Sequence, residues 1–241
     1  MRFCVCIKQV PDISTAVQTG RMVLNAYDAS AVEEALVLKE AHGGSVNLLL
    51  IGPEAARETI RKALAMGADS ATHVVRDDAA DLDSNAISEI LAEHLKDHEY
   101  DVVATGKQSQ DTDSGLAGSM VAERLGLAYA SNAVGLAIEG DSLVVTRQGD
   151  SGQEVLVLTT PCLVTCSNDM NNPRIPSLKG IMAAKRKQVV QIQSEAGERM
   201  TQVQGLEPVP SREPGQTFEA EPQELATLLV DKLVNEARVD L

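Results

Sequence analysis

Short apolar runs alternate with longer segments of helical periodicity through the first half of the chain. The strand-like runs are residues 3–7, 46–51, 72–75 and 101–105, and the helical patterns are residues 30–41, 53–66, 84–98 and 114–125. This alternation is typical of βαβ units, whose strands lie parallel in one sheet. The pattern therefore predicts an α/β fold built on a mainly parallel sheet.

The pattern changes after Gly126. Apolar runs at residues 133–138, 142–148 and 154–158 are separated only by short turn sequences, so they predict consecutive antiparallel strands. A further apolar run at 161–166 leads into a proline- and asparagine-rich loop and a small helix near 181–187. The α/β domain is therefore expected to occupy residues 1–188.

The remainder, residues 189–241, has a different character. Four prolines stand among polar residues between positions 208 and 222, and this composition does not support a packed domain of its own. Leucines at helical spacing then predict a terminal helix at 224–237. We expect an extended C-terminal arm, whose helix docks either on its own domain or on a partner subunit.

Charge and hydropathy exclude several classes of partner. The formal net charge of −14 disfavours nucleic acid, which attracts clustered Lys and Arg. Only 2% of residues are aromatic, which disfavours a platform for stacking bases. No run of about 18 apolar residues and no signal-like N-terminus occurs, so we expect a cytoplasmic protein without direct membrane insertion.

The cysteines and histidines give no pattern for metal binding or nucleophilic catalysis. Cys4 and Cys6 form one pair and Cys162 and Cys166 another, each inside an apolar strand, where alternation places both members on one face. These spacings fit metal loops poorly and favour buried free thiols. The four histidines lie in segments expected at the surface, with no nucleophile nearby. No catalytic or metal-binding residues are predicted.

Ligands of open α/β sheets bind beyond the carboxyl ends of the strands. Residues 6–9, 25–28, 51–53 and 106–118 are expected at such positions. The last segment is the most informative, because small residues between a buried strand and a helix let backbone N–H groups approach a phosphate. It matches neither GxGxxG nor GxxxxGK[ST]. The alternative is an ordinary polar loop in which Asp113 or Ser114 caps the helix.

Five segments together resemble the β subunit of electron transfer flavoproteins. In order, they are CVCIKQVPD, LNAYDASAVEEALVLKE, ETIRKALAMGAD, DVVATGKQSQDTDSG and NNPRIPSLKGIMAAKRK, which span Cys4 to Lys187. The resemblance implies a three-layer α/β sandwich of the adenine nucleotide α-hydrolase-like type. It also implies a heterodimer with an α subunit, on which residues 189–241 would pack.

The resemblance implies cofactors rather than catalytic side chains. An FAD would be shared with the α subunit, and this chain would bind either AMP or a second FAD. Carried over residue by residue, the cofactor contacts are Cys6, Asn25, Ala26, Tyr27, Asp28, Ile51, Gly106, Lys107, Gln108, Ser109, Gln110, Asp111, Asp113, Ser114, Gly115, Leu116, Ala117 and Gly118. The small residues Ser114, Gly115, Ala117 and Gly118 leave room for a diphosphate, and this observation gives a slight preference for FAD. An FAD here would accept hydride from NADH and split its electrons, as in the electron-bifurcating branch of the family.

The segment from Pro173 to Lys185 resembles the family's recognition loop for partner dehydrogenases. Pro173, Arg174, Leu178 and Lys179 are its implied docking residues, with Leu178 as the anchor. The partners would be flavin dehydrogenases, such as acyl-CoA dehydrogenases, or a quinone oxidoreductase. The alternative for Leu178 is a core position on a short helix.

Two other functions remain open from the sequence. A universal-stress-type nucleotide sensor could share the fold, but it needs neither the recognition loop nor the arm and is expected as a homodimer. An ATP-pyrophosphatase of the same superfamily needs a Ser-Gly-Gly phosphate loop after the first strand. Lys8, Gln9 and Val10 stand there instead.

Overall fold

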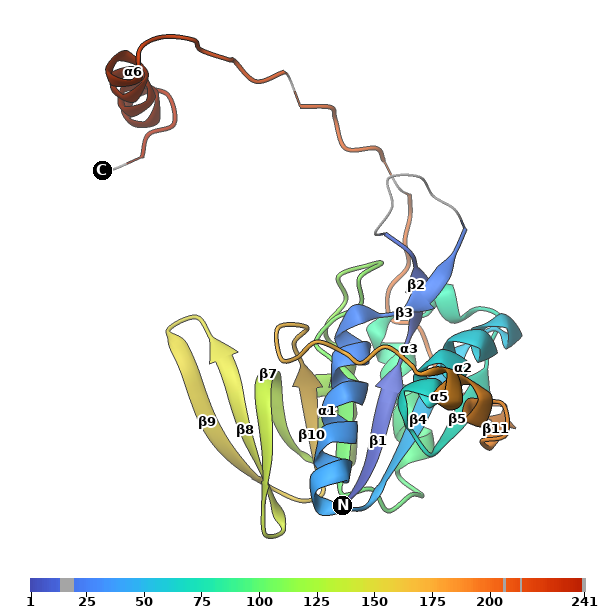
Figure 1. Cartoon of the computed structure of the whole chain (residues 1–241). Helices are drawn as coiled ribbons and strands as arrows, with labels where there is room; N and C mark the ends of the chain where they lie inside the picture. Colours follow the sequence, from blue (N-terminus) through green and yellow to red (C-terminus); the bar gives the residue numbers. More distant parts are fainter. Residues whose placement is uncertain (14–19, 206, 213, 240–241) are drawn as a thin grey trace. The chain divides into compact units, whose positions relative to one another are not determined.

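The computed structural model of the chain describes residues 1–13, 20–205, 207–212 and 214–239. It divides into two units, Met1–Gln202 and Val203–Leu241, which are considered separately. In the described part of the first unit, nine strands form one sheet in the order β11-β5-β4-β1-β6-β10-β7-β8-β9 (Figure 1). The strands are β1 (Arg2–Ile7), β4 (Ser45–Gly52), β5 (Ser70–Val75), β6 (Val102–Gly106), β7 (Ala128–Glu139), β8 (Ser142–Gly149), β9 (Gly152–Thr159), β10 (Cys162–Cys166) and β11 (Val189–Ile192).

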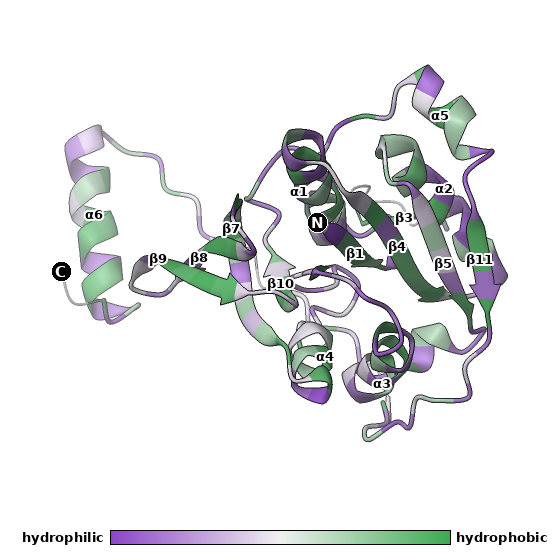
Figure 2. Cartoon of the chain, turned by 90° about the horizontal axis from the view of Figure 1, so that it is seen from below, coloured by the Kyte–Doolittle hydropathy of each residue, from purple (hydrophilic) through white to green (hydrophobic). Residues whose placement is uncertain are grey.

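The sheet is parallel from β11 to β7 and antiparallel from β7 to β9. The helices are α1 (Ala26–His42), α2 (Arg57–Met66), α3 (Ser84–Leu95), α4 (Ala117–Leu125) and α5 (Leu178–Ala184), with short 3-10 turns at Glu54–Ala56 and Ala79–Asp81. Figure 2 shows α1, α2 and α5 on one side of the sheet and α3 and α4 on the other. The predicted three-layer α/β fold is therefore confirmed.

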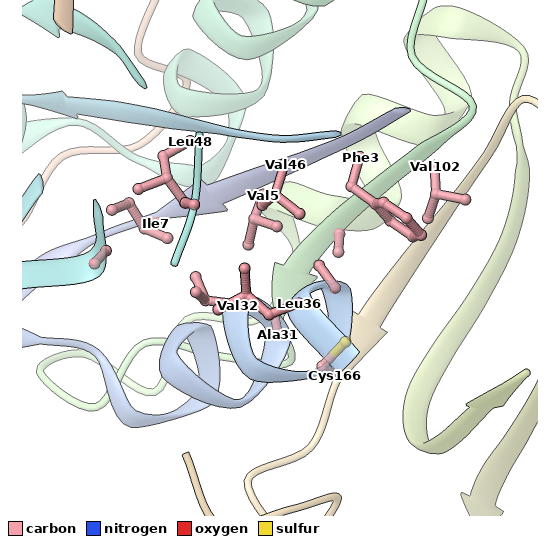
Figure 3. Close-up of a cluster of buried hydrophobic side chains, with 14 of the residues drawn as sticks. Phe3, Val5, Ile7, Ala31, Val32, Leu36, Val46, Leu48, Val102 and Cys166 are labelled. Atoms are coloured by element: carbon pink, nitrogen blue, oxygen red, sulfur yellow. The ribbon is translucent and has the colours of Figure 1, made fainter. Parts of the chain in front are cut away.

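Alternation along β1 builds two separate cores. Phe3, Val5 and Ile7 point to one face, where they pack against α1 residues such as Val32 and Leu36 (Figure 3). Cys4 and Cys6 point to the other face, toward α3 and α4. Full burial of a large apolar side chain contributes about 1.5–3 kcal/mol. A strand with buried side chains on both faces thus fixes the centre of the sheet.

The cysteines agree with the sequence prediction, whereas one histidine does not. All four cysteines are buried and free, and each pair lies on one face, as expected. His73, expected at the surface, is fully buried in β5, with Nε2 3.0 Å from the carbonyl oxygen of Gly52. The sequence does not reveal this, because residues 71–74 are buried on both faces of β5 and His73 Nε2 finds its partner in the neighbouring strand β4.

In the first unit, four helices begin at residues other than those predicted. α2 starts at Arg57 rather than at 53, after the 3-10 turn Glu54–Ala56. α1 starts at Ala26 rather than at residue 30, because the carbonyl oxygen of Asn25 accepts the first helical hydrogen bond, from Ala29. α4 starts at Ala117 rather than at 114, after a loop in which Asp113 has a left-handed φ of 52°. α5 spans Leu178–Ala184 rather than 181–187, since Ser177 Oγ caps it by accepting from Gly180 N.

The first unit also extends beyond the expected boundary at residue 188. β11 pairs in parallel with β5, and the next residues run along α3. Asp83 both caps α3, by accepting from Ala86 N, and accepts from the backbone of Met200 and Thr201. Residues 193–201 are called the strap from here on. The strap belongs to the α/β unit, so the arm begins near Val203.

The second unit contains one helix among its described residues, α6 (Pro222–Asn235), which begins with proline in its first turn. Leu229 and Val230 are exposed on it. Its packing on a partner subunit stays a prediction. Among all described helices, none has the length and hydropathy to cross a membrane.

Candidate functional site

The carboxyl edge of the sheet brings together the end of β1, the start of α1 and the loop after β6. Asp28 lies at this junction, where Oδ2 accepts from Lys8 N at 2.6 Å and Oδ1 accepts from Gly106 N at 3.0 Å. Burial raises the pKa of Asp28 to about 7, although hydrogen bonds from the Asn25 side chain and from these two amides act in the opposite direction. One side chain thus fixes two strand ends relative to α1.

Asn25 makes the second connection between α1 and the loop of residues 106–118. Its Nδ2 donates to the carbonyl of Gln108 at 2.9 Å, and its Oδ1 accepts from Gln110 N at 3.1 Å. Gln110 Oε1 in turn accepts from Ala26 N at 2.9 Å. Because Asn25 is almost fully buried, these bonds are shielded from competing water. Asn25, Ala26, Asp28, Gln108 and Gln110 are therefore held in one network.

The loop itself is closed by its own backbone. Lys107 N donates to the carbonyl of Cys166 at 2.8 Å, and Ser109 N donates to the carbonyl of Ser114 at 2.9 Å. Ser109 is buried, and its hydroxyl lies 2.9 Å from that of Thr112. Residues 111–116 are exposed. The loop therefore has a fixed base and an accessible tip.

The two aspartates of the loop shape it and do not cap α4. Asp111 forms an ion pair with Lys8 Nζ at 2.9 Å; burial opposes ionisation of Asp111, but Lys8 leaves its pKa below the usual value. Asp113 accepts from Gln108 Nε2 at 3.1 Å. Ser114 Oγ lies 2.8 Å from the hydroxyl of Ser84, so it does not cap α4 either. The alternative of an ordinary loop in which Asp113 or Ser114 caps the helix is therefore wrong in its capping residues.

The start of α4 has no side-chain cap among the described residues. Its N-cap residue is Leu116, which is exposed, and no side chain of the described residues caps the helix. The N–H groups of a first helical turn, here residues 117–119, have no carbonyl partner within the helix and carry its positive end. These uncapped amides beside an exposed loop tip fit a phosphate group.

The small residues of this segment have packing reasons of their own. A Cβ on Gly118 would lie 2.7 Å from Thr165 Cγ2 and 3.0 Å from Thr105 Oγ1, so α4 approaches the sheet there. A Cβ on Gly115 would lie 3.0 Å from the carbonyl oxygen of Lys107. Their size therefore does not by itself distinguish a diphosphate from a monophosphate.

Three predicted contacts lie around the junction rather than in its network. Cys6 is the next-to-last residue of β1, and its thiol is buried on the α3 face. A hydrogen bond with Cys4, then burial, raises the pKa of that thiol. Ile51 lies at the end of β4, partly buried in the same core. Tyr27 packs closely against Gly106. Contact of Cys6 and Ile51 with a ligand stays a prediction.

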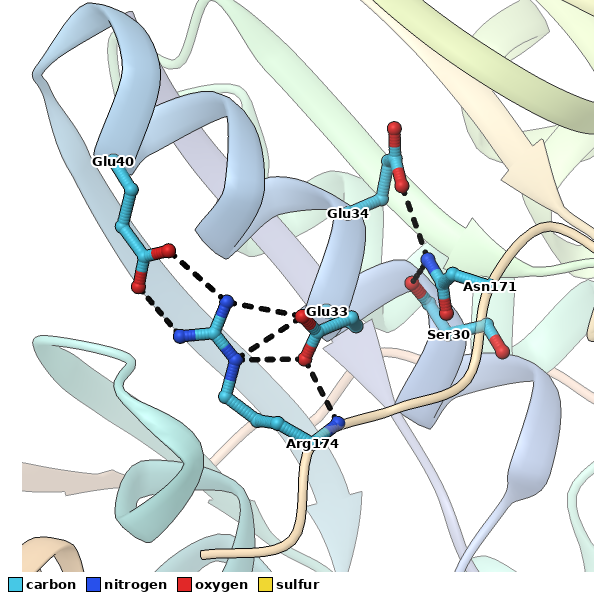
Figure 4. A network of polar contacts seen from close by, with 6 residues as sticks. All are labelled: Ser30, Glu33, Glu34, Glu40, Asn171 and Arg174. Atoms are coloured by element: carbon cyan, nitrogen blue, oxygen red, sulfur yellow. Dashed lines mark hydrogen bonds and ion pairs between the residues drawn. The ribbon is translucent and has the colours of Figure 1, made fainter.

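The loop between β10 and α5 is anchored on α1 (Figure 4). Arg174 Nε donates to Glu33 Oε2 at 2.8 Å, its backbone N donates to the same oxygen at 3.0 Å, and its guanidinium also bonds Glu40. Asn171 Nδ2 donates to the carbonyl of Ser30 at 3.1 Å. Arg174, predicted as a docking residue, is therefore engaged within the chain, and its contact with a partner stays a prediction.

Leu178, at the start of α5, is 77% exposed. The alternative of a core leucine is wrong. Pro173 and Lys179 are exposed as well, and neighbouring apolar side chains, Ile175 and Met182, are exposed beside them. A solvent-exposed apolar surface of this kind is typical of a protein-binding site.

Several residues of these networks were missed from the sequence. Lys8 lies in the segment of residues 6–9, whose place after the first strand is the signal for this edge, but its ion pair with Asp111 was not predicted. Ser84, Thr165 and Glu33 give no such signal, because their roles depend on segments distant in the chain. Among the described residues, no cluster of three or more His, Cys, Asp or Glu side chains could hold a metal ion.

The sequence profile of the electron transfer flavoprotein domain matches residues 13–196, which include the start of α1, the loop of residues 106–118 and the loop anchored on α1. The chain belongs to the electron transfer flavoprotein family. The electron transfer flavoprotein subunit beta of Bacillus subtilis is 34% identical over 239 residues, covering 92% of this chain and 93% of its own length. The subunit beta of Syntrophomonas wolfei is 32% identical over 252 residues, covering 100% and 99%.

A third relative, subunit CarD of the caffeyl-CoA reductase-Etf complex of Acetobacterium woodii, is 39% identical over 197 residues, covering 76% of this chain and 75% of its own length. Full-length similarity to β subunits confirms the resemblance drawn from the five sequence segments. As an electron transfer flavoprotein subunit, the chain has a role in flavin-linked electron transport.

Proposed function

We propose that this chain pairs with an electron transfer flavoprotein α subunit and passes electrons, through FAD shared with that subunit, between dehydrogenases or NADH and downstream acceptors. The observation that carries the proposal is the junction at which Asn25 and Asp28 fix the loop of residues 106–118 beside the uncapped start of α4. In a member of this family, that junction is a fitting place for an adenine nucleotide.

The nucleotide of this subunit is AMP or a second FAD. The slight preference for FAD rests on the resemblance of the KQVPD run and the C-terminal arm to the electron-bifurcating branch, not on the small residues of the loop. Backbone amides at residues 114–118 would hold its phosphates, while Asn25 and Asp28 keep the loop and the adenosine side in place. FAD, when bound, supplies the hydride and electron chemistry. Among the described residues, no group of three or more His, Cys, Asp or Glu side chains could hold a metal ion. In this proposal the chain contributes binding and orientation of the nucleotide.

Cofactor counting tests this proposal. The chain and its α subunit are co-expressed, the complex is purified, and the released nucleotides are separated and quantified. Two FAD per heterodimer would establish a flavin in this subunit, whereas one FAD with one AMP would replace the preference for FAD by AMP. A homodimer that binds ATP would instead support the universal-stress-type alternative and refute the proposal.

A Leu178→Ala change tests the docking surface. We expect KM for a partner flavin dehydrogenase, such as an acyl-CoA dehydrogenase, to rise about tenfold, equivalent to about 1.4 kcal/mol, because the change removes an exposed apolar anchor. The maximal rate should be unchanged, since Leu178 lies outside the nucleotide junction. Met200→Ala is the matched control, because Met200 is 71% exposed but lies in the strap beside α3, on the opposite face of the sheet. Equal effects of the two changes would exclude Leu178 as the anchor.

A further inference from the structure

Helix α1 makes polar contacts with two different loops along its length. Its first turn, through Asn25 and Asp28, holds the loop of residues 106–118. Its following turns, through Ser30 and Glu33, hold the loop that precedes α5. The proposed nucleotide site and the exposed surface around Leu178 therefore share one rigid element.

The contact between Glu33 and Arg174 is a strong constraint on the second loop. The Glu33 carboxylate is 10% exposed and accepts both from the Arg174 guanidinium and from the Arg174 backbone N. A carboxylate at such a position needs its partner, because leaving a buried charge unpaired is unfavourable. Both the backbone and the side chain of Arg174 are thus bonded to α1.

A second connection runs through the sheet. The carbonyl of Cys166, the last residue of β10, accepts from Lys107 N at 2.8 Å, and β10 leads directly into the loop that contains Asn171 and Arg174. The segment of residues 167–174 is therefore fixed at one end to the loop of residues 106–118 and at the other end to α1. A change in the order of the loop of residues 106–118 therefore reaches residues 167–174 both through Cys166 and through α1.

We propose that α1 couples nucleotide occupancy at the junction to the order of the loop at residues 167–178, so that nucleotide binding stabilises the surface that carries Leu178. Glu33 and Arg174 act as the positioning pair of this coupling. The coupling rests on the proposed nucleotide site and extends it to regulation of docking. Thermodynamic linkage makes the effect reciprocal. If nucleotide binding stabilises the ordered loop by a given factor, ordering of the loop by Glu33 and Arg174 raises nucleotide affinity by the same factor.

Hydrogen exchange on the full chain tests the coupling. Addition of saturating AMP, and separately of FAD, is expected to slow exchange of the amides in residues 167–178 by about fivefold or more. Glu33→Gln should abolish this slowing and weaken binding of the same nucleotide by a similar factor. Glu40→Gln is the matched control, because Glu40 bonds the same guanidinium from a position that is 58% exposed, so both effects should persist. A role of Glu33 confined to stability would leave nucleotide affinity unchanged.

The outcomes separate the coupling from the proposed function. Nucleotide binding with unchanged exchange at residues 167–178, or a Glu33→Gln variant with wild-type affinity, would overturn the coupling and leave the proposed function intact. A chain that binds neither AMP nor FAD would count against the proposed function. In that case Asn25→Ala in the nucleotide-free chain decides the coupling: about fivefold faster exchange at residues 167–178 supports it, and an unchanged rate overturns it.

Discussion

A Gly106→Ala variant is expected to lose about 3 kcal/mol of folding free energy and to release any nucleotide bound at the junction. An alanine Cβ at this position would clash with the Asp28 carboxylate and would lie 2.7 Å from Tyr27 Cβ and 2.9 Å from Asp28 N. Tyr27 Cβ and Asp28 N are held in place by the backbone of the first turn of α1, so rotation of one flexible side chain does not relieve these two contacts.

The expected magnitude has two parts. Overpacking of a well-packed site typically costs about 1–3 kcal/mol. Displacement of Asp28 also breaks its hydrogen bonds with Lys8 N and Gly106 N, and a buried amide without a partner costs about 1–3 kcal/mol. The loop of residues 106–118 would separate from α1, which explains the expected loss of nucleotide.

Urea unfolding and nucleotide retention after gel filtration measure the two effects. Gly135→Ala is the matched control, because a Cβ there meets only Thr146 at an ordinary 3.6 Å. We expect the control to retain wild-type stability within about 0.5 kcal/mol. If Gly106→Ala is as stable as the control, the close packing of Gly106 against α1 is wrong.

An Asp28→Asn variant is expected to be less stable than the wild type by about 2 kcal/mol near pH 5. Near pH 5 Asp28 is protonated in the folded chain, but both oxygens of the carboxylic acid still have lone pairs that can accept a hydrogen bond. The amide of asparagine keeps the shape of the side chain, but only one of its two terminal atoms can accept. Either Lys8 N or Gly106 N therefore faces an NH2 group and loses its acceptor, at a cost of about 1–3 kcal/mol. Urea unfolding at a series of pH values measures the loss.

The difference between wild type and Asp28→Asn should shrink as the pH rises. An aspartate of the unfolded chain titrates near pH 3.9, whereas burial raises the pKa of Asp28 to about 7 in the folded chain. The folded wild type therefore holds more protons than the unfolded chain between these values, and its stability falls by at most about 1.4 kcal/mol per pH unit from this group. Asparagine does not titrate. Asp77→Asn, at an exposed position, is the control and should show no such trend. A pH-independent difference between wild type and Asp28→Asn would contradict the raised pKa.

The sequence predicted those strands of the sheet that form a continuous local run of apolar residues. β4, expected at residues 46–51, spans Ser45–Gly52, because a continuous apolar run forms only where both faces are covered. β11 was missed, since the four residues Val189–Ile192 stand in a polar region and pair with β5, which lies far away in the sequence. The early start of α1 was missed for a similar reason, because its first turn has no apolar periodicity.

The candidate site was predictable as a set of segments but not as a set of contacts. The positions after strands pointed to Asn25, Asp28 and the loop of residues 106–118, and the structure brings these together. The sequence could not show that Asp28 connects two strand ends, or that Arg174 bonds Glu33 rather than remaining free. Such roles depend on contacts between residues that are far apart in the sequence, and local sequence patterns do not predict these contacts.

The position of β11 affects how the chain folds during synthesis. β1 leaves the ribosome first and forms the centre of the sheet, but the outer edge of β5 is covered only by β11, the last strand of the sheet to be made. Until residue 192 has emerged, β5 presents unpaired backbone groups that can bind the edge of another nascent chain. The strap then follows at once and crosses α3, so the same short stretch of sequence closes the sheet edge and covers the helix beside it.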